Sequence, residues 1–369
     1  MPRANVLIRR RVWCVIRPGG VSHQASIQLV ALALLLDDLA VARRALECLE
    51  PLEDGPLGLD PTPPATCRGQ GCGSPEHPAD HERAEPAAPV LAVHGTIVGV
   101  LVVTLGDALL DVIVRLGEPL TSGADALATT QTAAGGQAAN VAAWVVALGS
   151  RARNVSKRGD DLAGQLVTAE LEGRGVEVAG PVAGRNGIVV SLVGADGERT
   201  MASDRGVAPD LSPGDLEPAW FACDCLHISG YALLATPIDG AALSAARLAR
   251  ANGARVSVDL SAWTRIREHG PVRFREQLEE LAPDVIFANE AEWEIVGAAY
   301  GLAPTAVVKR GARGLLVLGE ERVELPARDG EVIDATGAGD ALAAGFLVGG
   351  PELALHAAAR AVAKPGAMP

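Results

Sequence analysis

The sequence predicts an α/β fold with a mostly parallel central sheet and helices on both of its faces. Short apolar runs of strand length recur along the chain, and longer stretches with helical periodicity separate several of them. Repeated alternation of strands and helices is typical of parallel sheets covered by helices. The expected strands are 100–105, 188–193, 225–229, 255–259, 285–288, 306–309 and 315–318, and the expected helices are 141–148, 240–252, 272–281 and 340–348.

Composition limits the class of protein. The chain has 369 residues, of which 49% are hydrophobic and 21% charged, so it can bury a substantial core in one large or two modest domains. A formal net charge of −13 argues against nucleic acid as a partner, and the 3% of aromatic residues offers no stacking platform for single strands. Six cysteines in a chain of this length do not indicate a disulfide framework, so a cytoplasmic location is expected.

The first 97 residues differ from the rest. We expect an N-terminal extension over residues 1–50 with a helix at 25–49, whose apolar run 29–36 is too short to span a membrane. Residues 51–97 are rich in Pro and Gly and are expected to form a disordered linker, followed by one domain over 98–369. The linker contains a cluster that could bind zinc, although its spacing is shorter than in a two-Cys, two-His finger: Cys67, Cys72, His77 and His81.

A glycine-rich turn near the end of the chain carries the strongest chemical signal. The segment Asp334-Ala-Thr336-Gly337-Ala338-Gly339-Asp340 opens an apolar helix, where the amides of residues 337–339 could stabilise a phosphate. Asp340 is placed to accept a proton from an attacking hydroxyl. The plainer alternative is a turn in which Asp340 only caps the helix.

A second motif lies upstream, in Gly135-Gly136-Gln-Ala-Ala-Asn140-Val-Ala. Two glycines allow a ligand to approach the backbone, and Asn140 offers an amide to hydroxyl groups. On physical grounds alone, this motif indicates a polyol pocket only weakly.

The two motifs together resemble the signatures of the ribokinase (PfkB-type) family of carbohydrate and nucleoside kinases, in the same order. Ala335 stands where the family usually has Thr, and Leu342 where Phe is frequent; neither change removes a catalytic group. The resemblance extends over about residues 98–369. It implies a three-layer α/β/α domain with a small β lid formed by residues 186–201 and parts of 111–135.

The resemblance also implies roles for individual residues. Asp340 is expected to be the catalytic base, with Gly337, Ala338 and Gly339 binding the transferred phosphoryl group. Asp111, Gly135, Gly136 and Asn140 are expected to hold the acceptor. The expected ATP and Mg²⁺ residues are Asn289, Glu292, Lys309, Gly311 and Gly314, and K⁺ is expected at Asp334 and Thr336.

The function expected from this resemblance is ATP-dependent phosphorylation of a hydroxyl on a small sugar or nucleoside, with Mg²⁺ held mainly by ATP and no protein-only metal site. The family's lids often pair between subunits, so a homodimer is expected. A ribose-like sugar or a nucleoside such as pseudouridine is ranked ahead of a sugar phosphate, because no second basic cluster is evident near Asp111.

Two other classes of function remain as alternatives. One is a non-catalytic sugar- or nucleoside-binding regulator with the same fold. The other is a dinucleotide-dependent oxidoreductase, which is disfavoured because no G-x-G-x-x-G follows the first strand.

Overall fold

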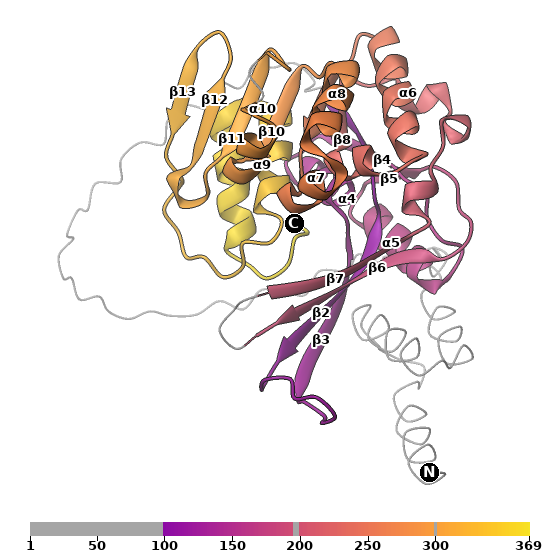
Figure 1. Ribbon diagram of the computed structural model, residues 1–369, viewed down its shortest axis with the longest axis vertical. Coiled ribbons are helices and arrows are strands. Elements are labelled where there is room, and N and C mark those ends of the chain that lie inside the picture. The colour runs from indigo at the N-terminus through magenta and orange to yellow at the C-terminus, as the bar shows by residue number, and fades with distance from the viewer. Residues whose placement is uncertain (1–98, 195–198, 299–300) are drawn as a thin grey trace, which may run out of the picture. The chain divides into compact units, whose positions relative to one another are not determined.

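A nine-stranded sheet lies at the centre of the computed structural model, which describes residues 99–194, 199–298 and 301–369 (Figure 1). The predicted extension, the predicted linker and the Cys/His cluster at 67–81 lie outside the described residues. The strand order is β13-β12-β11-β10-β9-β8-β1-β4-β5. Their bounds are β1 Leu101–Leu105, β4 Arg151–Val155, β5 Glu177–Ala179, β8 Cys225–Ser229, β9 Arg255–Asp259, β10 Val285–Asn289, β11 Thr305–Lys309, β12 Leu315–Leu318 and β13 Arg322–Leu325.

The predicted mostly parallel sheet is confirmed. The strands from β5 to β11 in this order run parallel, and only the pairings β11–β12 and β12–β13 at one edge are antiparallel. The central strands read as continuous apolar runs because both faces of the sheet are covered, as parallel sheets require. Val103, Leu226, Val258 and Ile286 are fully buried on four neighbouring strands.

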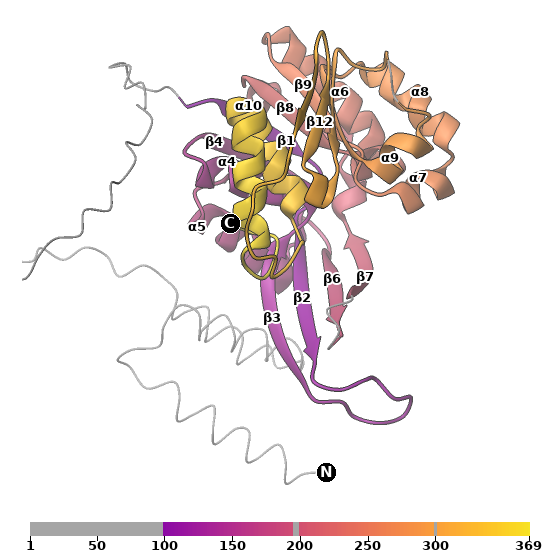
Figure 2. The same ribbon diagram turned by 90° about the vertical axis from the view of Figure 1, so that its left-hand side faces the viewer.

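Helices form the two outer layers. Figure 2 shows α4, α5 and α10 on one side of the sheet and α6, α7, α8 and α9 on the other. Their bounds are α4 Gln137–Ala147, α5 Leu162–Gly173, α6 Ile238–Ala251, α7 Trp263–His269, α8 Pro271–Leu281, α9 Glu290–Ile295 and α10 Ala338–Val362. The predicted helices at 240–252 and 272–281 agree with α6 and α8 to within two residues.

The last helix is longer than predicted. The expected segment 340–348 ends where α10 is interrupted by Gly349 (φ −151°) and Gly350 (φ 81°), after which helical structure resumes to Val362. By length and composition α10 could cross a membrane, but half of its apolar stretch is buried in the fold. Together with the interruption, this burial identifies α10 as a core helix of the domain.

A separate four-stranded sheet forms the predicted lid, with the order β3-β2-β6-β7. Its strands are β2 Leu109–Leu116, β3 Ala128–Gly135, β6 Asn186–Val193 and β7 Arg199–Gly206. The strand predicted at 100–105 agrees with β1. The chain leaves the central sheet after Leu105 and enters the lid at Leu109, so Asp111 belongs to the lid.

Candidate active site

A cavity of about 720 Å³ lies between the lid and the carboxyl ends of the central strands. Alternate residues of β7 line it, namely Arg199, Met201, Ser203 and Arg205. Successive side chains of a strand point to opposite faces, so one face of the lid is directed into the cavity. Opposite the lid, the cavity is lined by Ser229, by residues near the start of α4 (Gly136, Gln137 and Asn140) and by Gly337 and Asp340 at the start of α10.

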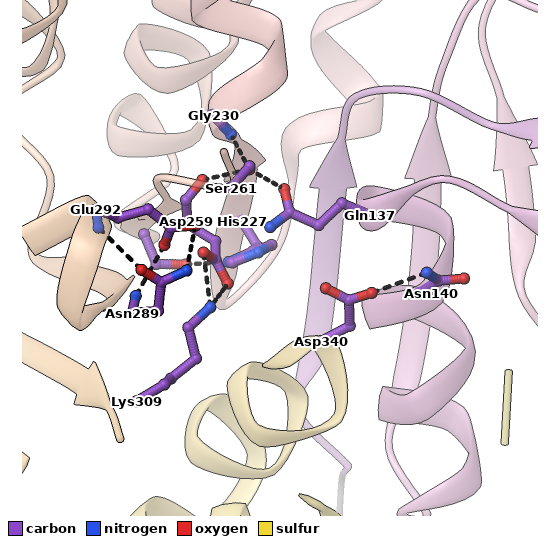
Figure 3. A network of polar contacts seen from close by, with 11 residues as sticks. Gln137, Asn140, His227, Gly230, Asp259, Ser261, Asn289, Glu292, Lys309 and Asp340 are labelled. Atoms are coloured by element: carbon purple, nitrogen blue, oxygen red, sulfur yellow. Dashed lines mark hydrogen bonds and ion pairs between the residues drawn. The ribbon is translucent and has the colours of Figure 1, made fainter. Parts of the chain in front are cut away.

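Asp340 lies in the first turn of α10 and faces Asn140 of α4 (Figure 3). The Nδ2 of Asn140 donates a hydrogen bond of 2.8 Å to Oδ2 of Asp340. The N-cap position belongs to Gly337, and Asp340 makes no capping hydrogen bond, so the plainer alternative of a capping Asp340 is wrong. The carboxylate is therefore available to a ligand in the cavity.

The pKa of Asp340 is raised from 3.8 to about 7. Burial, which penalises the charged form, is the largest cause, and the hydrogen bond from Asn140 opposes it. The negative charges of Asp259 and Asp111 raise this pKa further, whereas the positive charge of Lys309 lowers it. A carboxyl group with a pKa near neutral pH is suited to general-base catalysis.

The turn before α10 has the shape that binds an anion. Gly337 has a φ of 74°, and a Cβ at this position would lie 2.6 Å from Cα of Ala367, so only glycine fits. Ala338 N–H donates to the carbonyl of Ala335 at 3.3 Å. The first amides of a helix lack intrahelical partners, and the N-terminus of α10 therefore presents a partial positive charge beside Asp340.

Asp111 lies directly on the backbone of the neighbouring lid strand. A Cβ at Gly135 would come within 2.2 Å of Oδ2 of Asp111, so glycine at this position makes room for the carboxylate. Gly136 follows as the N-cap of α4, in contact range of the Asp107 carbonyl. The pKa of Asp111 rises from 3.8 to about 7, mainly through burial, while the charge of Arg199 lowers it.

Asn140 has further capacity for a ligand. Its Nδ2 is used by Asp340, but its buried Oδ1 has no hydrogen-bond partner within the described structure. Buried polar atoms are nearly always paired, and Asn140 is one of the residues that line the cavity. The structure thus brings six of the expected site residues to one cavity, with Gly135 beneath Asp111: Asp111, Gly136, Asn140, Thr336, Gly337 and Asp340.

The residues expected on the ATP side lie at the ends of β10 and β11, outside the lining of this cavity. Asn289 caps α9, and both carboxylate oxygens of Glu292 accept from Asn289, at 2.8 Å from N and 2.7 Å from Nδ2. Lys309 binds both oxygens of Asp259, at 2.7 and 2.9 Å. Gly311 and Gly314 flank the short turn between β11 and β12.

The described residues contain no group of three or more His, Cys, Asp or Glu side chains arranged to hold a metal ion. Asn289 and Glu292 are oxygen donors of the kind that Mg²⁺ accepts, but in this arrangement they bond to each other. They fit a Mg²⁺ that keeps most of its ligands from phosphate and water, and they do not form a cage for a bare ion.

Asp334 joins the glycine turn to the C-terminal segment. Its Oδ1 accepts from Thr336 N at 2.9 Å, and its Oδ2 accepts from Gly366 N at 3.0 Å. Arg199 of the lid contacts Thr336 Oγ1 and lies 3.8 Å from Asp334 Oδ1. The hydrogen bonds to Gly366 and Thr336 lower the pKa of Asp334, against the opposing effect of burial.

Sequence reasoning missed several residues of the site. Asp259 is fully buried at the end of β9, and Ser261 adopts a φ of 78° while its hydroxyl donates to Gln137 Oε1 at 2.6 Å. The only sequence signal for either residue is the position of Asp259 at the end of a predicted apolar strand. The expectation that no basic cluster lies near Asp111 is wrong, because the chain brings distant basic residues into the same cavity: Arg199, Arg205, Arg265 and His269.

The chain belongs to the pfkB family of carbohydrate kinases, because the sequence model of that family matches residues 100–367. It is 32% identical to an ATP-dependent ribose-1-phosphate kinase of Halopiger xanaduensis, over 67% of this chain and 84% of the relative. A cytidine kinase of Thermococcus kodakarensis is 28% identical over 59% of this chain and 80% of the relative. The crystal structure of adenosine kinase from Sinorhizobium meliloti superposes with a TM-score of 0.65 at 27% identity, covering 73% of this chain and 96% of that chain.

The fold and the family together define a phosphotransferase with an alcohol group as acceptor. The protein is an ATP-dependent kinase that acts on a small sugar or nucleoside, and this finding excludes the dinucleotide-dependent oxidoreductase considered above.

The raised pKa of Asp340 predicts a pH-dependent gain in stability for Asp340→Asn. The folded state binds the Asp340 proton more tightly than the unfolded state, so the native protein loses stability as the pH rises from 3.8 towards about 7. Asn carries no such penalty and keeps a partner for Asn140. We expect the unfolding free energy of the variant, relative to wild type, to increase between pH 5 and pH 8 by on the order of 1 kcal/mol or more. Urea unfolding at both pH values, with the exposed Glu294→Gln as control, measures this difference; an equal difference at both pH values contradicts the prediction.

Proposed function

We propose that the acceptor is a ribose that carries a polar group on its anomeric carbon. The observation that carries this proposal is the size of the cavity and the two kinds of side chain that line it. Its volume of about 720 Å³ suits a ligand larger than a free pentose. The lining includes Asp340, Asn140 and Asp111, which match sugar hydroxyls.

A second set of lining residues differs in chemistry. It consists of Tyr231, Arg205, Arg265, Glu268 and His269. Arg205 is held by Asp107 at 2.6 and 2.8 Å and lies 5.9 Å from the centre of the Tyr231 ring. These groups offer charge-assisted hydrogen bonds to a phosphate or to the edge of a nucleobase.

The names of several relatives support the same acceptor class. Ribose-1-phosphate kinase, cytidine kinase and aminoimidazole riboside kinase are each named for a ribose with a group on C1. They differ in that group and share the sugar. In this proposal the shared sugar is bound by Asp340, Asn140 and Asp111, and the variable group by the second set of lining residues.

Asp340 acts as the general base in this proposal. It takes the proton of the acceptor hydroxyl while the hydroxyl oxygen forms a bond to the γ-phosphorus of ATP. The bond from that phosphorus to the bridging oxygen breaks, and ADP leaves with the electron pair. The amides at the start of α10 stabilise the charge on the transferred group, and Asp111 and the free Oδ1 of Asn140 orient the acceptor.

ATP is proposed to lie along the ends of β10 and β11, beside Asn289, Glu292, Lys309, Gly311 and Gly314. Bound Mg²⁺ would neutralise phosphate charge and would be reached by Asn289 and Glu292 through water. Closure of the lid excludes water, since an open site would hydrolyse ATP. The cytoplasm is the proposed location, because ATP is available there, and the net charge of −13 makes a nucleic-acid partner unfavourable.

A substrate panel tests this function. Turnover with ATP and Mg²⁺ is measured on ribose, ribose 1-phosphate, ribose 5-phosphate, fructose, cytidine, adenosine and pseudouridine. We expect a C1-substituted ribose to have a kcat/KM at least tenfold above that of free ribose, and Asp340→Asn to lose at least a hundredfold in kcat, the range of a lost general base.

Other outcomes of the panel are equally informative. Preference for fructose or free ribose would contradict the C1-substituted acceptor. Binding of a ligand with no turnover on any compound would support the alternative of a non-catalytic sugar- or nucleoside-binding regulator.

A monovalent cation site is proposed between Asp334, Thr336 and the segment 363–369. The carboxylate of Asp334 and the turn that it fixes against Gly366 support the site, and the nearby Arg199 already supplies part of the positive charge. We expect a rise in kcat when tetramethylammonium is replaced by K⁺ at constant ionic strength. Equal rates in K⁺, Na⁺ and tetramethylammonium would remove this site from the proposal.

A homodimer through the lid is proposed from the exposed features of its sheet. Strands β3 and β7 each pair on one side only, and Leu120 and Leu127 of the loop between β2 and β3 are 58% and 78% exposed. Sedimentation velocity at micromolar concentration should show a dimer that Leu127→Lys weakens. If the protein stays monomeric at all concentrations up to about 50-fold higher than this, the proposal is refuted.

A further inference from the structure

Lys309 places a fixed positive charge beneath the phosphate-binding turn. It is the last residue of β11, and its side chain is 15% exposed. A Cβ added to Gly339 would lie 3.2 Å from Nζ of Lys309, so the ammonium group lies against the backbone of the turn that opens α10. The charge of Lys309 and the partial charge of the helix N-terminus therefore act at the same point.

Asp259 holds this ammonium group in place. Both of its oxygens bond to Lys309 Nζ, and its own side chain has no exposed surface (Figure 3). The pair connects the ends of β9 and β11, with β10 between them. Since Asp259 uses both oxygens in this pair, Lys309 is a charge in a fixed position and not a mobile surface cation.

Several charged groups surround this ion pair and Asp340. Asp340 is hydrogen-bonded to Asn140 of α4, and its pKa is influenced by the charges of Asp259 of β9, Lys309 of β11 and Asp111 of the lid. Lys309 in turn is influenced by Asp259, by Glu292 of α9 and by Asp340. The Coulombic effects on the pKa of Asp340 have opposite signs: Asp259 and Asp111 raise it, and Lys309 lowers it.

We infer that Lys309 is a positioning residue that keeps the base Asp340 ionised, and that Asp259 sets the size of this effect by fixing and partly neutralising the ammonium group. This inference relies on the proposed role of Asp340 as general base, and it gives Lys309 a role that does not require contact with ATP. Burial destabilises the ionised form of the Asp340 carboxylate, because water is excluded from it. A cation fixed nearby compensates for that loss without occupying the cavity.

The two members of the ion pair should therefore affect catalysis in opposite directions. Lys309→Met removes the positive charge and keeps the length of the side chain, so the acidic limb of the kcat profile should move to higher pH by about one unit, the size typical of a neighbouring charge. Asp259→Asn removes the negative charge, so the same limb should move to lower pH. Lys309→Arg keeps the charge and should leave the limb within a few tenths of a unit.

The experiment measures kcat from pH 5.5 to 9.5, with saturating ATP, Mg²⁺ and acceptor, for the native protein, these three variants and Asp340→Asn. Thermal unfolding of each variant is measured over the same range. A merely structural role for the pair predicts that both charge-removing variants lose stability and activity at every pH, with no opposite displacement of the acidic limb, and this result would overturn the inference.

Asp340→Asn separates the inference from the proposed function. If Asp340→Asn keeps substantial turnover, the assignment of the base fails and the inference fails with it. If Asp340→Asn is inactive and Lys309→Met leaves the acidic limb in place, only the inference about Lys309 is wrong. Opposite displacement in Lys309→Met and Asp259→Asn, with an inactive Asp340→Asn, establishes it.

Discussion

The hydrogen bond between Asn140 and Asp340 is the contact on which the site depends, because it joins two motifs that lie 200 residues apart in the chain. It connects the first turn of α4 to the first turn of α10, and both helices begin at the carboxyl edge of the sheet. Each helix starts with a glycine as N-cap, Gly136 and Gly337, which leaves its first turn open to a ligand. One contact between two helix N-termini therefore brings the glycine turn before α10 to the same cavity as the start of α4.

Burial of charge is the second constraint on this site. Asp111 and Asp340 face the same cavity, and both have pKa values raised to about 7, so keeping both ionised is unfavourable. Arg199 lowers the pKa of Asp111 from the lid, and Lys309 lowers that of Asp340 from beneath the turn. The lid contributes to the electrostatics of the site through Arg199 as well as covering it. These two buried carboxylates therefore destabilise the folded protein, and replacing either with a neutral side chain would increase its stability.

Much of the fold could be predicted from local patterns. The strands at 225–229, 255–259 and 315–318 agree with the structure residue by residue, because each is a short run rich in apolar residues. The strand predicted at 100–105 also agrees with the structure, but no local pattern shows that the chain then passes from the central sheet into the lid at Leu109. Helix α10 is longer than predicted, because packing supports helical structure beyond Gly349 and Gly350.

The sequence by itself determined the family and singled out the glycine turn before Asp340, together with Asp340, Asn140 and Asp111, since these depend on short motifs whose residues are close together in the chain. Only the tertiary structure decided which groups surround them. Asp259 pairs with Lys309 across 50 residues, and Arg205 pairs with Asp107 across 98. Such pairs leave no periodic or motif signal, because the distance between two side chains in space is set by the strand order of the sheet and the closure of the lid. The pKa values of Asp111 and Asp340, and the presence of basic residues in the cavity lining, follow from those distances.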